Sequence, residues 1–426
     1  MTKLSTRKKQ RKKRHILATA IFVIFFLGIN IGFLLYQTLH PSEFFLFVND
    51  VDRLPNGNTA VRVGNFLTTI KIATGQERSN CYSAIVEVNS NGDIVWQYTP
   101  KDPSSVHVDH EIKKRVFKGS VGYFFTDCLA DKIRFVNKET KEITWEYWLG
   151  DINWSEVNSS WGESHYYNTP DIIDWSHLND FNFHNYSNWE SMLVSIRDFN
   201  LIIEVNFTRA QNRSKAQASD IIWYYGGDGI LACQHNPEYL PNGNILIVDS
   251  DHLRIIEVNK STKNIEREWT SEIMTWPRDC DLMPDGELFL VTDADEVFIL
   301  NKSSGNIELR IPFGGYEADY IEDTNTILVG GDTVGKFKEF NADSGKELYQ
   351  WGGGIQEVLT INLIIIIFYE LYWFTFVSIT SKTNNRRNRF WKWLKMIILL
   401  TLIAGELFLI FQFKTIHDMV FVQAIC

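Results

Sequence analysis

The segment Ile255-Ile256-Glu257-Val258-Asn259 is one of six similar runs of apolar and β-branched residues that end in asparagine. A polar turn such as Ser303-Ser304-Gly305-Asn306 follows most of them, and the next run often contains an aromatic residue. Several are preceded by a hairpin signal such as Pro241-Asn242-Gly243-Asn244, because Asn-Gly between apolar runs favours a tight turn. The six runs occupy residues 85–89, 133–137, 202–206, 255–259, 297–301 and 337–341.

This repetition predicts the fold. Each unit of roughly 40–70 residues is typical of a four-stranded meander, and six consecutive units indicate a six-bladed β-propeller. Closing the ring leaves only short, protected sheet edges. We therefore expect an all-β propeller over residues 40–354. The third unit is the longest, and we expect its insert, at about 150–176, to cap one face.

Composition excludes several other classes of protein. The chain has 426 residues, of which 14% are aromatic and only 10 are proline, so it is neither disordered nor collagen-like. Five cysteines in this length exclude a small disulfide-stapled scaffold.

Charge is distributed unevenly along the chain. Residues 1–14 contain eight basic residues and no acidic one, and residues 382–395 contain six and none. Residues 40–354, in contrast, carry 27 basic and 48 acidic residues, a net charge of −21. Both basic runs lie beside long apolar segments, so we interpret them as flanks of membrane spans and expect no nucleic-acid partner.

Three apolar segments are long enough to cross a bilayer core of about 30 Å as helices: residues 16–36, 358–379 and 396–413. The positive-inside rule places the tail 1–15 and the loop 380–395 in the cytoplasm. The propeller and the tail 414–426 are then outside, in a multi-pass protein of the cell membrane. Glu370 and Glu406 fall near mid-span, where we expect them to be protonated or hydrogen-bonded to each other.

Histidines recur at one position of the repeat. In a propeller, the start of each innermost strand points at the central channel. Three of the six units have a histidine there: His110, His177 and His235. Arg197, on the second strand of the third unit, adds a guanidinium at a similar depth. The same position in the other units falls within residues 48–50, 276–279 and 316–319.

Several chemistries fit three histidines. They could be structural, or they could bind zinc, copper or nickel. Arg197 argues against a cation and for an anion such as phosphate, sulfate or carboxylate. The sequence has no nucleophile elbow, no phosphate-binding P-loop and no dinucleotide fingerprint. We therefore expect a local anion site within an otherwise acidic domain.

Three segments carry a resemblance to a known family. Residues 175–180 (Trp-Ser-His-Leu-Asn-Asp), residues 194–200 (Val-Ser-Ile-Arg-Asp-Phe-Asn) and residues 234–237 (Gln-His-Asn-Pro), the last ahead of residues 240–244, resemble the aryl-sulfate sulfotransferases. The chain looks most similar to their membrane-anchored archaeal branch, which also has segments like residues 276–279 and 316–319. The resemblance covers about residues 48–350.

The resemblance implies an enzyme that moves a sulfuryl group from an aryl sulfate to an acceptor hydroxyl, without the nucleotide donor PAPS and without a cofactor. His235 matches the histidine that is transiently sulfated. Arg197 and His177 match residues that hold the sulfate oxygens, and His110 matches the remaining active-site histidine. The chain lacks the N-terminal β-sandwich of the soluble bacterial members and adds three spans, so the acceptor classes are phenols, lipids and envelope glycans.

The sequence is also compatible with two other functions, since one fold hosts many activities. One is a non-catalytic propeller that serves as a binding or scaffold module on a membrane anchor. The other is a metal-dependent propeller hydrolase or lyase.

The outer segment also carries sites of covalent modification. Cys81, Cys128, Cys233 and Cys280 lie where disulfides persist, and four cysteines allow three pairings. A bridge at Cys233 and a buried thiol there are both compatible with the sequence. We expect a glycoprotein, since seven Asn-x-Ser/Thr sequons start at residues 153, 158, 185, 206, 212, 259 and 301.

Overall fold

The computed structural model describes residues 47–64, 83–102, 105–161, 174–227, 229–331 and 335–352. All of them belong to one of the two compact units of the chain, residues 45–352. Within these described ranges, no helix is both long and apolar enough to cross a membrane. The three predicted spans, with Glu370 and Glu406, lie outside the described residues.

The described strands form six four-stranded antiparallel sheets, each built from consecutive strands. We number these sheets as blades 1 to 6. Blade 1 consists of β1 (Phe47–Arg53), β2 (Thr59–Gly64), β3 (Ser83–Val88) and β4 (Ile94–Tyr98). Blade 2 consists of β5 (Asp109–Phe117), β6 (Ser120–Asp127), β7 (Lys132–Asn137) and β8 (Ile143–Trp148). Blade 3 consists of β9 (Leu178–Asn185), β10 (Glu190–Ile196), β11 (Leu201–Asn206) and β12 (Ile221–Gly226).

The second half of the ring repeats the same order. Blade 4 consists of β13 (His235–Tyr239), β14 (Ile245–Asp249), β15 (Arg254–Val258) and β16 (Ile265–Thr270). Blade 5 consists of β17 (Pro277–Leu282), β18 (Leu288–Asp293), β19 (Val297–Asn301) and β20 (Ile307–Ile311). Blade 6 consists of β21 (Glu317–Ile321), β22 (Thr326–Gly331), β23 (Lys336–Asn341) and β24 (Glu347–Gly352).

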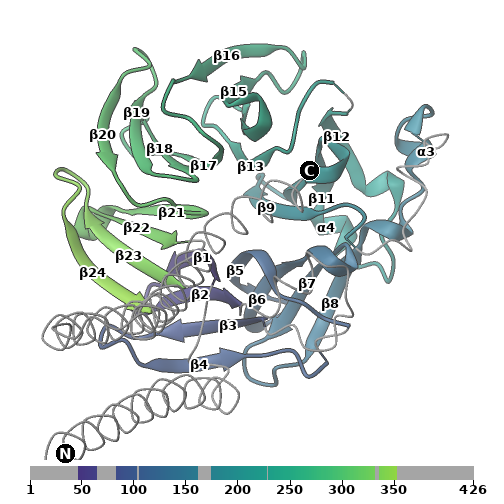
Figure 1. Ribbon diagram of the computed structural model, residues 1–426. Coiled ribbons are helices and arrows are strands. Elements are labelled where there is room, and N and C mark those ends of the chain that lie inside the picture. The colour runs from purple at the N-terminus through teal and green to yellow at the C-terminus, as the bar shows by residue number, and fades with distance from the viewer. Residues whose placement is uncertain are drawn as a thin grey trace, which may run out of the picture. The chain divides into compact units, whose positions relative to one another are not determined.

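The six blades close into a ring, which confirms the predicted six-bladed β-propeller. Each innermost strand contacts the innermost strands of both neighbouring blades, and β21 contacts β1 to complete the cycle. Figure 1 shows these strands around the centre and the fourth strands at the rim. The apolar clusters mostly lie between sheets; one contains Val48 and Val61 of blade 1 together with Leu328 and Phe337 of blade 6.

The repeated asparagine has a structural reason. It ends or directly follows the third strand of every blade, and its side-chain oxygen accepts backbone N–H groups two to four residues later. Asparagine is favoured in turns because its side chain can make these local bonds. In blade 3 the same contact, at 3.0 Å from the N–H of Arg209, begins α4 (Phe207–Ala210) instead of a turn.

The aromatic residue of the fourth strand links neighbouring blades. The indole N–H of Trp96, Trp223, Trp269 and Trp351 donates to a carbonyl in the asparagine turn of the next blade, at 2.8 to 3.0 Å. Blade 6 uses this bond to reach blade 1, where Trp351 donates to Gly92. Side-chain contacts of this kind hold the ring closed, since each sheet contains strands of one blade alone.

The predicted insert lies between blade 2 and blade 3. Its described part begins with η3 (Leu149–Asp151) and α3 (Trp154–Val157). Trp154 and Trp175 pack edge-on against Phe199, and Trp161 packs against Tyr224, so these residues extend the core of blade 3. Residues 162–173, on which the expected cap depends, lie outside the described residues. The other short helices are η2 (Cys128–Ala130), η6 (Arg197–Phe199), η7 (Ala218–Asp220), η8 (Ser250–His252) and η9 (Glu322–Thr324).

Candidate active site

The innermost strands are irregular where the histidines lie. The pairing of β5 with β6 shifts between Asp109 and Ile112, and that of β13 with β14 shifts between His235 and Glu238. His110 has a backbone φ of 29°, His177 of 43° and Asn236 of 35°. Such left-handed conformations are costly for non-glycine residues and often mark functional sites. The register shifts and the left-handed residues therefore lie at the positions that carry the histidines.

His110 and His177 form a direct pair across blades 2 and 3. Their Nε2 atoms lie 3.1 Å apart, and the Nδ1 atom of His177 lies 2.8 Å from Asp174 Oδ2. The carboxylate of Asp174 favours a proton on Nδ1 of His177, so one further hydrogen lies between the two Nε2 atoms. Burial, which Asp109 only partly offsets, lowers the pKa of His110 to about 3, so His110 is neutral at neutral pH.

His235 is held from one side only. Its Nδ1 atom lies 2.8 Å from the hydroxyl of Ser250, and its ring packs edge-on against Trp276 and Tyr316. The residue is 2% exposed, and its Nε2 atom has no hydrogen-bond partner among the described residues. Burial and the nearby charge of Arg197 lower the pKa of His235 well below its usual value. In the tautomer whose Nδ1–H is donated to Ser250, Nε2 carries a lone pair.

Two buried arginines supply positive charge around this ring. Arg197 is 1% exposed and donates through Nε and Nη2 to Asp198, whereas its Nη1 atom has no partner within the described ranges. Arg278 stacks between Trp276 and Tyr316, with its guanidinium carbon 4.5 and 4.3 Å from the two ring centroids. The charge of each arginine acts on His235.

Tyr316 connects the two halves of the site. Its ring lies 5.1 Å from the ring of His110 and 6.0 Å from that of His235, centroid to centroid. The structure thus brings the four residues predicted from the sequence, His110, His177, Arg197 and His235, into one buried cluster. Trp276, Arg278 and Tyr316 join it. Residues 276–279 and 316–319 occupy the same repeat position as the histidines, and this position indicated that they face the channel.

Asp109 organises a supporting group that the histidine pattern did not indicate. Its Oδ2 atom lies 2.8 Å from His107 Nδ1 and accepts the Cys128 thiol at 2.7 Å, and its Oδ1 atom accepts from Arg62 at 2.9 Å. Burial favours the neutral acid, but His107 and Arg62 together hold the pKa of Asp109 well below its usual value. Asp109 therefore stays ionised beside His110.

Two overlapping sets of side chains have metal-ligand spacing: Asp109, His110 and Cys128, and Cys128, Asp174 and His177. A zinc ion would need Cys128 as a thiolate. Without a metal, burial and the charges of Asp109 and Asp174 raise the pKa of this thiol well above its usual value, so a metal would have to displace its proton. The carboxylate of Asp109 already binds Arg62 and His107, and Arg197 and Arg278 provide positive charge for an anion beside His235.

The described cysteines do not form a disulfide with one another. Cys128 and Cys280 are buried and reduced, and Cys233 is bonded to neither. Cys81, the fourth predicted outer cysteine, lies outside the described residues, so no pairing of the four is seen.

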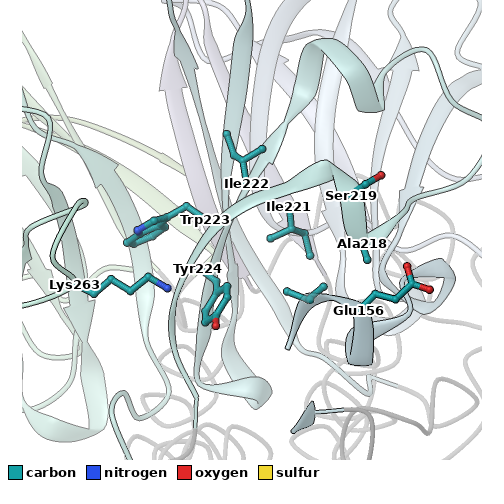
Figure 2. Close-up of a pocket in the computed structure, with 9 residues that line it drawn as sticks. Glu156, Ala218, Ser219, Ile221, Ile222, Trp223, Tyr224 and Lys263 are labelled. Atoms are coloured by element: carbon teal, nitrogen blue, oxygen red, sulfur yellow. The ribbon is translucent and has the colours of Figure 1, made fainter. Parts of the chain in front are cut away.

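A shallow pocket lies away from the histidine cluster. Its volume is about 440 Å³, and Glu156, Ser219, Ile222, Tyr224 and Lys263 are among the residues that line it. Figure 2 shows these side chains around β12, the rim strand of blade 3. None of the residues predicted for the site contributes to this pocket.

Comparison with known proteins adds little about function. No family model and no curated protein matches the chain. Among solved structures, the BamB protein from Moraxella catarrhalis aligns over 71% of this chain and 74% of its own, with 9% sequence identity and a TM-score of 0.32. At this similarity the alignment supports no conclusion about activity, substrate or partner.

Proposed function

We propose that the chain is a membrane-anchored, extracytoplasmic aryl-sulfate sulfotransferase that works through a sulfo-histidine intermediate. One observation carries this proposal: the Nε2 atom of His235 is buried and unpartnered among the described residues, and two arginines stand close by. A neutral imidazole with a free lone pair is a nucleophile, and the arginines provide charge for sulfate oxygens.

In the first half-reaction, the His235 Nε2 lone pair attacks sulfur and the bond from sulfur to the aryl oxygen breaks. The new ring cation keeps its Nδ1–H, which Ser250 accepts. The Nη1 group of Arg197 donates to an oxygen of the transferring group. In the proposal, His177 carries an additional proton that Asp174 stabilises, and this proton passes to the departing phenolate.

In the second half-reaction, an acceptor hydroxyl attacks sulfur and the bond from sulfur to Nε2 breaks. The hydroxyl proton returns to His177, so the pair of histidines ends as it began. No cofactor enters this balance. The acceptor is a phenol, a lipid or an envelope glycan, and the predicted anchor would hold the propeller at the outer membrane surface.

The near-complete burial of the cluster favours a second candidate, a non-catalytic binding or scaffold module that holds an anion without transferring it. His235 and Arg197 are 2% and 1% exposed. A metal-dependent hydrolase or lyase on the same fold is a third candidate. Chelators would abolish the activity of such an enzyme, but not that of the proposed sulfotransferase.

The deciding assay uses the full chain, purified in detergent, with 4-nitrophenyl sulfate as donor and phenol as acceptor. We expect nitrophenol release that depends on phenol and persists in EDTA, and donor-only incubation should add one SO₃ to the peptide with His235. Anion binding without release would favour the binding module. Release that EDTA abolishes would favour the metal-dependent enzyme.

The membrane topology is tested separately. Protease added to intact cells should digest the segment 40–354 and spare the loop 380–395, because the basic runs are expected inside. Digestion of the loop in intact cells would reverse the proposed orientation.

A further inference from the structure

A second cluster of charged side chains lines the innermost strands. Nine carboxylates come from the innermost strands of all six blades, and their charges act on one another and on one cation, Lys113. They are Asp50, Asp52, Glu111, Asp180, Glu238, Asp279, Asp281, Glu317 and Asp319. One ammonium cannot neutralise nine ionised carboxylates, so burial favours their neutral, proton-sharing forms when no further cation is present.

Three of these acids converge. One oxygen from each of Asp50, Glu111 and Glu317 lies within 4.8 Å of the other two. Asp50 is 0% and Glu111 4% exposed, whereas Glu317 is half-buried. The ammonium of Lys113 lies 2.5 Å from Glu111, which it partly neutralises.

Buried acceptor oxygens provide an independent indication of a ligand. Asp50 accepts the N–H of Ile112 with Oδ2, but its Oδ1 atom has no partner among the residues described. The Oδ1 atoms of Asp180 and Asn236 also have no hydrogen-bond donor among the residues described, and each residue is 8% exposed. Both residues form hydrogen bonds through their other atoms. Buried oxygens without donors need a cation or water.

The donor set identifies the class of cation. All the available ligand atoms are carboxylate or amide oxygens. Calcium and magnesium prefer oxygen ligands, whereas zinc and copper are bound mainly by imidazole and thiolate groups. Calcium binds at about 2.3–2.6 Å, so two of its ligands are separated by up to roughly 5 Å. Magnesium requires about 2.0–2.1 Å and a near-octahedral arrangement. Oxygens that lie within 4.8 Å of one another are all within reach of one calcium ion, whose flexible coordination does not require an octahedral arrangement.

We propose that a calcium ion binds in the propeller channel to Asp50, Glu111 and Glu317. This departs from our expectation of a cofactor-free chain and does not depend on sulfuryl transfer. Glu111 follows His110, and Glu317 follows Tyr316, so the ion joins strands that also carry the candidate active site. By tying β1, β5 and β21 together, calcium stabilises the ring where its first and last blades meet.

The test uses the full chain in detergent after treatment with EGTA. Calorimetric titration with CaCl₂ should show about one site per chain, and CaCl₂ should raise the midpoint of thermal unfolding, because a ligand that binds only the folded state stabilises it. MgCl₂ at the same concentration should have a much smaller effect. The variant Asp50→Asn/Glu317→Gln should lose both responses, whereas Glu322→Gln/Asp323→Asn, on the exposed loop of blade 6, should keep them.

The wild-type measurement alone can overturn the proposal, even if the double variant does not fold. Absence of bound calcium and of any thermal shift in millimolar CaCl₂ would show that the acids share protons instead. An unchanged calcium response in the double variant would exclude these ligands, and an equal response to magnesium would exclude a calcium-specific site.

Discussion

The Nε2 atoms of His110 and His177 lie 3.1 Å apart, so two neighbouring blades share a hydrogen bond at the channel. Asp174 binds the far nitrogen of His177 at 2.8 Å and thereby fixes which nitrogen of that ring carries a proton. In the proposed mechanism, the pair relays a proton only while Asp174 is ionised. Burial alone would raise the pKa of Asp174, but His177 and Arg197 hold it below its usual value.

Asp174→Asn should therefore slow turnover by at least about tenfold, because the amide no longer stabilises a protonated His177. We expect kcat to fall with little change in KM, and the pH dependence of kcat to change shape, which a merely structural defect would not cause. Asp295→Asn, an exposed change in blade 5, is the control. A pH profile identical to that of the wild type would exclude Asp174 from proton transfer.

His235→Ala should abolish both half-reactions, since Nε2 of His235 is the proposed nucleophile. Mass spectrometry after incubation with donor alone should show an added SO₃ group on the wild type and none on the variant. His252→Ala, which removes a more exposed histidine of η8, should behave as the wild type. Normal nitrophenol release by His235→Ala would disprove the nucleophile assignment.

Arg197→Lys should fail to restore activity and should reduce kcat by about 100-fold. A lysine keeps the charge but cannot both bind Asp198 with two N–H groups and direct a third toward the transferring sulfuryl group. Arg209→Lys on the surface helix α4 is the matched control. Near-normal kcat with a raised KM would assign Arg197 to ground-state binding alone.

The donor half-reaction should not weaken when the pH falls through about 6.5, where an ordinary histidine gains its proton. Burial and the charge of Arg197 keep His235 neutral to a lower pH. Single-turnover sulfation of the wild type, measured between pH 8 and 5.5, should show no acidic limb near 6.5. A loss of rate centred there would mean that His235 is solvated during the reaction.

The channel acids predict a pH dependence of stability. Burial, with the charges of Asp52 and Asp281, raises the pKa of Glu111 to about 7, and burial with Asp281 raises that of Glu238 to about 8. In EGTA and between pH 6.5 and 8, these carboxyl groups hold more protons in the folded chain than in the unfolded chain. The free energy of unfolding should therefore fall as the pH rises. Below about pH 6.5 the buried histidines oppose this trend, since unfolding lets them protonate.

Thermal unfolding in EGTA at pH 6.5 and 8 measures this effect, and the midpoint should be higher at pH 6.5. Glu238→Gln should reduce the difference between the two midpoints, whereas the exposed change Glu322→Gln should not. Equal midpoints in the wild type would show that the acids are already compensated without calcium.

The sequence predicted what depends on local chemistry. Asn259 and its five counterparts stand where the third strands end, because an asparagine turn is encoded within a few residues. His110 and His235 could be assigned to the channel because the repeat fixes their position in a blade. Arg278 and Tyr316 occupy the same position, but their contacts depend on how blades 5 and 6 meet the others, which no local pattern specifies.

The acidic group was missed for a similar reason. Asp50 and Asp52, Asp279 and Asp281, and Glu317 and Asp319 each stand two residues apart on an innermost strand, a spacing that places both side chains on one face. This spacing is visible in the sequence. The electrostatic interaction between the acids, however, arises only because the six innermost strands lie side by side around the channel. Position within a repeat was therefore predictable, and electrostatic coupling between repeats was not.

Because every sheet is made from consecutive strands, the order of synthesis is also the order of the blades around the ring. Each blade can pair its own strands as soon as it leaves the ribosome, without waiting for a distant partner. The histidine cluster is different, since it draws on blades 2 to 5 and on Tyr316, which directly precedes the last blade. A chain that stops after blade 5 therefore has neither a closed ring nor a complete cluster, and any chemistry at His235 begins only when synthesis of the propeller is finished.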